Sequence, residues 1–491
     1  MKKKSRIAYL GLALFWGFGC AADEHVRALD RELKETALAA MPAKAYENMM
    51  PSPDARRVVF LTEEGKQACV SIDGRAGKKY DEIGGIVVSP DSRRVLYGAR
   101  VGKKWVAVLD GRESEKYDAL AAPAFGPQGL KAVFIPRVGG KQCLVVNGQA
   151  GPKFDKVEYP VFSPDGKHVA YTAQTGSKWV AVVDGKRGPA GDEISGLIFS
   201  PDSQQVAYRI KTGSQECIWR EGKKEKAYGL VGDPFFSPDS RQLAYKAVVD
   251  VQEVLVVNGV EGQGVDEIED ATLTFSPDSQ HLAFVSKNKK QKQVVRDGKA
   301  GKPFAAILKG TLLFSPDSAH VAYVAQTEKN IKDKKVVVVT DDQAGPLWDE
   351  VEKDKMVWSP APSRLAFVGK RENAYVTVLD GKETGKYFFA GKCVFSADGK
   401  RCGYVTVSGG RPSVVVDGKA RSKYGDAWPP VFSADGRHVA YAAKLNQKVF
   451  AVVDGKESPA YDDIAGAQIV FDGNDGFHYI GLKAAADKKN Y

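Results

Sequence analysis

The sequence predicts an all-β protein built from tandem four-stranded repeats, and three observations support this prediction. A ten-residue string related to FSPDGKHVAY recurs along the chain, at intervals of 37 residues where the spacing is regular. A second string, related to WVAVVDGKRG, lies between copies of the first, and an aromatic–acidic pair follows it. A helical period of 3.6 residues is missing from the sequence after about residue 43.

The first motif has the composition of a tight turn between two strands. Pro presets φ at the first corner of such a turn, and the Asp side chain bonds back to the backbone. The copies begin at Phe162, Phe199, Phe236, Phe275, Phe314, Phe395 and Phe432, with weaker ones near Met50, Val88, Phe125, Trp358 and Phe471. We expect Asp165, Asp202, Asp239, Asp278 and Asp317 to cap their own turns. We expect Phe162, Phe199, Phe236, Phe275 and Phe314 to be buried between repeats.

The second and third motifs supply the other two strands. The run Trp179–Val183 is continuous and β-branched, as in a strand that is buried on both faces. Asp184-Gly185 follows it, and this pair is a strong signal for a type I′ hairpin, which needs φ > 0 at both corners. The fourth strand then carries the aromatic–acidic pair and a following Ile.

The repeats must stack, because a lone four-stranded sheet of about 37 residues cannot bury both of its faces. Radial stacking gives a β-propeller, and linear stacking into a β-solenoid is the alternative. Twelve copies exceed the four to eight blades of a typical propeller. We therefore predict two tandem six-bladed propellers, residues 44–264 and 265–491, with one large ring as the alternative. A strand around Tyr46 is expected to complete the last sheet at Ala467–Leu482.

The string FSPDGKHVAY and its copies resemble the WD40-like repeat of TolB-type β-propellers, over roughly residues 44–482. The same signature occurs in the propellers of prolyl-oligopeptidase relatives. The resemblance implies a propeller fold and, as in TolB, binding of envelope lipoproteins and peptide segments. Two features of these families are missing, since the chain lacks both the α/β domain before the TolB propeller and the hydrolase domain of the peptidases.

The N-terminus has the pattern of an export signal. Lys2, Lys3, Lys4 and Arg6 precede the apolar run 7–18, which is too short to span a bilayer. Residues 1–19 are predicted to be a signal peptide, and residues 20–43 a tether with one short helix. Gly19-Cys20 resembles the end of a bacterial lipobox, so Cys20 is the candidate lipidation site, although Gly17 stands where that motif usually has Leu. Cleavage after Ala22, giving a soluble periplasmic or secreted protein, is the alternative.

Five cysteines follow Cys20. Cys69, Cys143 and Cys217 hold one position in alternate repeats, so they are expected to be small buried hydrophobic residues. Cys393 and Cys402 flank a turn symmetrically and are predicted to face each other, as a candidate disulfide in an oxidising compartment. Two free thiols are the alternative.

The sequence gives no catalytic, cofactor-binding or metal-binding constellation. His168, His281, His320 and His438 share a position that Arg or Gln fills in other repeats, which predicts a surface strand position. The acidic cluster Asp266-Glu267-Glu269-Asp270 lacks the ligand spacing of a calcium loop. Removing the four leader charges from the net charge of +10 leaves +6, spread evenly, which argues against nucleic-acid binding.

These observations predict a non-catalytic binding or scaffold protein of the cell envelope that requires no cofactor. Its expected partners are envelope proteins or peptides, and its only expected membrane attachment is the lipid anchor at Cys20, in the periplasm or at the outer membrane. The alternative is a propeller enzyme or sensor acting on peptidoglycan, polysaccharide or peptide at a central channel.

Overall fold

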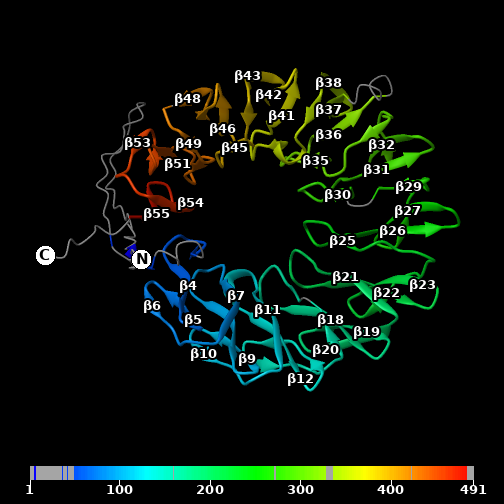
Figure 1. Cartoon of the computed structure of the whole chain (residues 1–491). Helices are drawn as coiled ribbons and strands as arrows, with labels where there is room; N and C mark the ends of the chain where they lie inside the picture. The colour runs from blue at the N-terminus through cyan, green and yellow to red at the C-terminus, as the bar shows by residue number, and fades with distance from the viewer. Residues whose placement is uncertain are drawn as a thin grey trace. The chain divides into compact units, whose positions relative to one another are not determined.

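The computed structural model describes residues 5–6, 36, 41–42, 49–158, 160–269, 272–327, 335–421 and 423–483. In these ranges the chain forms eleven antiparallel sheets of four or five strands and a C-terminal hairpin (Figure 1). Two short 3-10 turns, η2 (Pro127–Gly129) and η4 (Lys353–Lys355), interrupt them. The all-β repeat architecture is therefore confirmed, with sheets like the blades of a propeller. Their grouping into one or two propellers stays a prediction.

The chain divides into two compact units. Unit 2 contains residues 64–68 and 78–314. Its strands from residue 82 onward are β7 (Glu82–Val88), β8 (Val95–Val101), β9 (Lys104–Leu109), β10 (Arg112–Glu113), β11 (Ala119–Phe125), β12 (Ala132–Val138), β13 (Lys141–Gln142), β14 (Val145–Val146), β15 (Gln149–Ala150), β16 (Lys156–Val157), β17 (Val161–Phe162), β18 (Val169–Thr175), β19 (Lys178–Val183), β20 (Lys186–Gly191), β21 (Glu193–Phe199), β22 (Val206–Thr212), β23 (Gln215–Arg220), β24 (Lys223–Lys224), β25 (Phe235–Phe236), β26 (Leu243–Val249), β27 (Gln252–Val257), β28 (Val260–Glu261), β29 (Glu267–Ile268), β30 (Thr274–Phe275), β31 (Leu282–Asn288), β32 (Gln291–Arg296), β33 (Lys299–Ala300), β34 (Ala306–Ile307) and β35 (Leu313–Phe314).

Unit 1 contains the described residues of 1–63, 69–77 and 315–491. The remaining strands are β1 (Ser5–Arg6), β2 (Met41–Pro42), β3 (Met50–Pro51), β4 (Val58–Glu64), β5 (Gln67–Ile72), β6 (Arg75–Ala76), β36 (Val321–Gln326), β37 (Val336–Thr340), β38 (Gln343–Trp348), β39 (Glu350–Val351), β40 (Val357–Trp358), β41 (Leu365–Arg371), β42 (Ala374–Leu379), β43 (Lys382–Tyr387), β44 (Phe389–Ala390), β45 (Val394–Phe395), β46 (Cys402–Ser408), β47 (Arg411–Val416), β48 (Lys419–Arg421), β49 (Asp426–Ala427), β50 (Val431–Phe432), β51 (Val439–Leu445), β52 (Lys448–Val453), β53 (Lys456–Glu457), β54 (Asp463–Asp472) and β55 (Gly476–Leu482). The predicted boundary at residue 264 lies within unit 2 and stays a prediction.

The sheet of β16 to β20 shows the plan of one repeat. Strand β17 pairs with β18, β18 with β19, and β19 with β20, all antiparallel. We call these four positions the A, B, C and D strands. The A–B turn contains the Ser-Pro-Asp motif, and the C–D turn contains Asp-Gly, as the sequence predicts.

The Ser-Pro-Asp turn is held by its own side chains. Ser163 Oγ donates to Asp165 Oδ1 over 2.6 Å and accepts the backbone N–H of His168 over 2.9 Å. Asp165 Oδ1 also accepts the backbone N–H of Lys167. These hydrogen bonds, with that from Ser163 first, lower the pKa of Asp165 to about 2. The same Ser-to-Asp bond forms at Asp202, Asp239, Asp278 and Asp317, so the predicted capping is confirmed.

The Asp-Gly turn joins three strands of a sheet. Asp184 and Gly185 have φ of 45° and 79°, which confirms the predicted left-handed corners. Asp184 Oδ1 accepts the backbone N–H of Val169 at the start of the B strand, and Oδ2 lies 2.6 Å from Nδ1 of His168. One carboxylate therefore fixes the C–D turn to the start of the B strand.

The aromatic–acidic pair lies where the chain crosses from one sheet to the next. The aromatic residue pairs with its own sheet, as the predicted fourth strand requires, but the apolar residue after the pair belongs to the next sheet, which corrects that part of the prediction. Phe154 pairs backward with Gln142 of its own sheet, whereas Val157 pairs forward with Ala173 of the following sheet. Asp155 accepts hydrogen bonds from Lys141 in the first sheet and from the backbone N–H of Gly176 in the second. The motif thus connects neighbouring sheets, a long-range role that sequence periodicity does not reveal.

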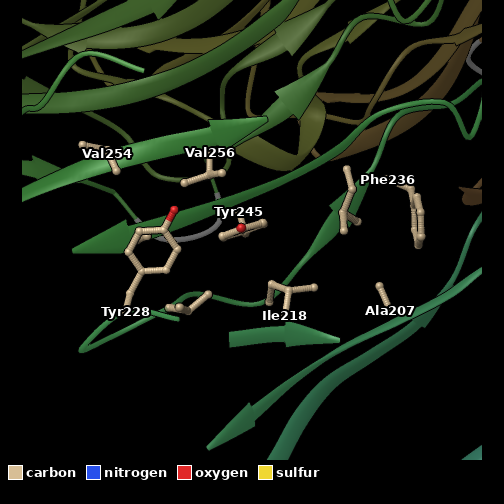
Figure 2. Close-up of a cluster of buried hydrophobic side chains, with 10 residues drawn as sticks. Ala207, Ile218, Tyr228, Phe236, Tyr245, Val254 and Val256 are labelled. Carbon is tan, nitrogen blue, oxygen red and sulfur yellow. The ribbon is translucent and has the colours of Figure 1, made fainter. Parts of the chain in front are cut away.

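The core consists of side chains packed between successive sheets. Figure 2 shows one such cluster, in which Ile218 faces Tyr245 and Val256 of the next sheet. The predicted burial of the turn Phe residues is correct for Phe236 and Phe275, which are 5% and 6% exposed. Phe162, Phe199 and Phe314 are only partly buried, so the prediction is wrong for these three.

The two ends of the described chain meet within unit 1. Ala465, Ile480 and Leu482 of β54 and β55 pack against Val58 and Phe60 of β4. Arg56 Nη2 also lies 2.7 Å from Asp472 Oδ1. The predicted A and B strands at the C-terminus are present as this hairpin. Tyr46, predicted to complete the hairpin's sheet, lies outside the described residues.

Candidate functional site

Two pockets open between neighbouring sheets at the same position of the repeat. The first lies in unit 2 between the sheet of β25 to β28 and the sheet of β29 to β33, with a volume of about 400 Å³. Leu255, Val257, Phe275, Phe284 and Val295 form its apolar wall. We call it the Phe284 pocket. Its size is within the range of about 300–1,000 Å³ that is typical of ligand sites.

The second pocket lies in unit 1 between the β36–β38 strands and the sheet of β39 to β43, with a volume of about 460 Å³. Val338, Leu365, Phe367 and Val378 form its apolar wall, and Trp348 also lines it. We call it the Phe367 pocket. Both pockets have the D strand of one sheet on one side and the B and C strands of the next on the other.

A pair of residues distinguishes these two interfaces from two others. In those two, a B-strand Tyr reaches a glycine in or just after the D strand of the preceding sheet. A Cβ placed on Gly188 would lie 2.6 Å from the hydroxyl oxygen of Tyr208, so the hydroxyl fills the space left by the glycine. Gly151 and Tyr171 form a looser version, at 3.5 Å.

In both pockets the glycine remains but the Tyr is replaced by Phe. A Cβ on Gly262 would meet only a backbone oxygen at 3.1 Å, and one on Gly345 only a backbone oxygen at 3.2 Å. Phe284 and Phe367 have no hydroxyl that could reach across. The combination of a D-strand glycine with a B-strand Phe therefore leaves the interface open.

The Phe367 pocket also contains hydrogen-bond donors without a partner. Trp348 is 1% exposed, and its indole Nε1 has no hydrogen-bond partner in the part of the chain that the structure describes. The same holds for Nε1 of Trp358, which lines the opposite wall. A buried donor without an acceptor costs about 1–3 kcal/mol, so an incoming acceptor would be favoured here.

The charged groups around the Phe367 pocket are paired. His320 Nδ1 lies 2.6 Å from Asp341 Oδ2, and Arg371 Nη1 lies 2.7 Å from Glu383 Oε1. Asp380 is bound by the guanidinium of Arg364 at 2.8 Å. Asp380 and Glu383 therefore each have an arginine partner, and Asp341 has an imidazole partner, which suits an uncharged ligand.

Both tryptophan rings also have aromatic or cationic neighbours. The Arg371 guanidinium lies 4.1 Å from the centre of the Trp348 ring, and Phe367 packs against that ring edge to face. His320 stacks on one face of Trp358 with an angle of 20° between the rings. The Nε1 atoms of both indoles are buried.

The Phe284 pocket lies at the same position of the repeat but lacks these donors. Val265 and Phe275 stand where the other pocket has Trp348 and Trp358. The Glu261 carboxylate on its rim accepts hydrogen bonds from Lys226 and Tyr228. Among the described residues, none of the buried side-chain polar atoms that lack a partner belongs to this pocket.

The candidate disulfide residues lie in one buried cluster of unit 1, away from both pocket linings. Cys402 pairs with Phe395 in the ladder, so the two cysteines are offset by two residues rather than directly opposite, which corrects the predicted register. Both are present as free thiols that share a hydrogen bond. That bond, with burial, raises the pKa of Cys393. The disulfide itself stays a prediction.

The other residues singled out in the sequence have structural roles or cannot be placed. Cys69, Cys143 and Cys217 are buried, as predicted. The four repeat histidines each contact the Asp of a C–D turn. Cys20 and Asp270 lie outside the described residues. In the described ranges, no group of three or more His, Cys, Asp and Glu residues is arranged to hold a metal ion.

Sequence reasoning missed both pockets, although a signal for them was present. The third residue of the B strand is Tyr in most repeats but Phe in four of them, at Phe60, Phe134, Phe284 and Phe367, and the last two line the pockets. Gly262 and Gly345 precede them by 22 residues in each case. Only the structure shows that these positions face each other across two sheets.

No family model and no curated protein sequence matches the chain. Among solved structures, the chain is similar to a eukaryotic initiation factor, with 11% identity over 67% of this chain and 95% of that chain, and a TM-score of 0.37. TolB from Acinetobacter baumannii matches with 15% identity over 49% and 77%, and a TM-score of 0.24. The Dos1 propeller matches with 11% identity over 67% and 90%, and a TM-score of 0.27. These likenesses to propellers add nothing about ligands or partners.

Proposed function

We propose that the chain is a non-catalytic binding protein of the cell envelope that holds protein or peptide partners. The observation that carries this proposal is the Phe367 pocket, an apolar recess whose rim carboxylates already have partners and whose lining includes two tryptophans with buried, unpartnered Nε1 atoms. Such a combination of apolar wall and few fixed polar groups is typical of binding sites. The chemistry on its rim, in which each carboxylate is already paired, favours binding over acid–base catalysis.

The proposal includes export and a lipid anchor at Cys20. It is supported by the basic head and short apolar run of residues 1–19. Within the residues that the structure describes, no helix has the length and hydropathy to cross a membrane. Labelling cells with radioactive palmitate tests the anchor: the chain should be labelled, and a Cys20→Ala variant should not. Equal labelling of the two would contradict it.

The binding role is tested by capture from an envelope extract. The mature protein is immobilised, exposed to the extract at low and moderate salt, and the retained proteins are identified by mass spectrometry. A heat-unfolded sample of the same chain is the control for non-specific adsorption. We expect a partner that is retained by the folded chain alone and that binds again when both proteins are purified. If the folded and unfolded chains retain the same proteins, the proposal is wrong.

A further inference from the structure

We propose that the Phe367 pocket binds an uncharged apolar side chain of a peptide, and that a neighbouring peptide carbonyl accepts a hydrogen bond from the indole N–H of Trp348 or Trp358. This inference rests on the proposed function, and names the chemistry that the site recognises.

The wall of the pocket sets the apolar part of the ligand. Val338, Leu365, Phe367 and Val378 offer aliphatic and aromatic carbon, and the volume of about 460 Å³ is larger than one side chain needs. Burying apolar surface there is favourable by about 25 cal/mol for each Å² removed from water. The remaining volume accommodates the backbone atoms on either side of that side chain.

The two indoles set the polar part. Each Nε1–H is a donor that cannot accept, so its partner must be an acceptor such as a carbonyl oxygen. Both tryptophans line the same pocket, and their Nε1 atoms, which are buried, have no partner among the described residues. A bound carbonyl therefore reaches one of them through a change of side-chain rotamer, which is common when partners bind. An amide carbonyl satisfies one of them without introducing a charge.

The rim and the rings disfavour other ligand classes. A charged ligand would compete with existing contacts, because Asp380 and Glu383 are bound to Arg364 and Arg371, and Asp341 contacts His320. A sugar would need a free aromatic face for stacking, and Arg371 and His320 already lie over one face of Trp348 and of Trp358.

The strand beside the pocket gives a peptide a place to lie. Strand β38 is the last in the order β36-β37-β38, and its first five residues, 343–347, are all exposed. Leu347 is 43% exposed although it is apolar. Extended peptides commonly bind along such strand edges, with alternate side chains entering pockets. The corresponding D strand beside the Phe284 pocket, β28, has only two residues.

The test uses the full mature chain labelled with ¹⁵N at the tryptophan indoles, and the probe N-acetyl-leucine-N-methylamide. Trp358→Phe and Trp348→Phe variants assign the two resonances. We expect the probe to shift at least one of the two indole resonances downfield, which is the direction that a new hydrogen bond produces. The Kd should be about 1 mM, as expected for a ligand of this size. Zwitterionic leucine and methyl glucoside should leave both resonances unchanged.

Two occluding variants provide matched controls. Phe367→Tyr introduces the residue that most repeats have at this position. Gly345→Thr introduces the residue that the next repeat has at the position of Gly345, namely Thr384, whose hydroxyl lies 2.8 Å from that of Tyr404. Each variant should raise the Kd for the probe by about tenfold or more, whereas Phe284→Tyr in the other pocket should leave this Kd unchanged. Because these residues are native to the repeat, loss of folding is not expected, and the melting temperature checks it.

Three results would overturn the inference: unchanged indole resonances at tens of millimolar probe, shifts that persist in both occluding variants, or tighter binding of the glucoside than of the amide. Failure here is distinguishable from failure of the proposed function. If the captured partner still binds Phe367→Tyr as well as the native chain, the pocket assignment is wrong while the binding role stands.

Discussion

The interface between Gly188 and Tyr208 and the interface between Gly345 and Phe367 are built from equivalent strands, yet they are filled differently. At this one contact they differ by a hydroxyl group. In the first interface the Tyr208 oxygen lies 2.6 Å from the position of a Gly188 Cβ, whereas the second contains a pocket of about 460 Å³. In a repeat protein, a change of side chain at one contact between repeats can therefore contribute to a site without disturbing the fold.

The largest effect is expected from removing an aromatic ring in a closed interface. Phe236 is 5% exposed and packs in the cluster of Figure 2, so Phe236→Ala should lower the free energy of unfolding by about 3–5 kcal/mol. Phe284→Ala should cost less, since part of that ring already borders a pocket. Urea unfolding measures both. Equal losses would mean that the two interfaces are packed alike.

A matched pair of glycine substitutions tests how the space is filled. Gly188→Ala forces a methyl group against the Tyr208 hydroxyl and should destabilise by about 1–3 kcal/mol. Gly262→Ala faces Phe284 and only a backbone oxygen at 3.1 Å, so it should be close to neutral or stabilising by up to about 1 kcal/mol. Thermal unfolding of the two variants checks this, and a reversed order would refute the explanation for the pockets.

The pH dependence should also distinguish closed from open interfaces. Burial raises the pKa of Tyr171 to about 12, above the value near 10 of an unfolded tyrosine. As the pH rises, the unfolded chain therefore loses this proton before the folded chain does. The contribution of Tyr171 to the free energy of unfolding is fully present below pH 10 and is lost as the pH rises toward 12. Phe284 and Phe367 contribute nothing to this loss.

Urea midpoints at pH 9 and pH 11.5 measure the effect. The urea midpoint of Tyr171→Phe should fall less between these two pH values than that of the native chain. The midpoint of Phe367→Tyr should fall at least as much as that of the native chain. The same slope for Tyr171→Phe and the native chain would show that this hydroxyl is not protected by burial.

The smallest effect is expected at the exposed link between sheets. Asp155→Ala removes the hydrogen bonds from Lys141 and from the backbone of Gly176, but the carboxylate lies at the surface, where ion pairs contribute little. We expect a drop in melting temperature near the limit of detection, and one that high salt reduces further. A drop as large as that of Phe236→Ala would mean that the crossover, rather than the apolar packing, holds the sheets together.

The sequence was informative where structure is set by neighbours in the chain. The Ser163–Asp165 turn and the Asp184-Gly185 corner were predicted, because their hydrogen bonds and left-handed φ values arise within a few residues. The pairing of Val157 with the following sheet was not, because its partner depends on register between repeats. The pockets were missed for the same reason, since Gly345 and Phe367 meet only when two sheets pack.

The central claim is that the Gly–Phe combination leaves space that the Gly–Tyr combination fills. Crystals of the chain under xenon pressure test it directly, because xenon occupies apolar cavities. The account predicts xenon density beside Phe284 and beside Phe367, and none between Gly188 and Tyr208. Xenon at all three interfaces, or at none, would contradict it.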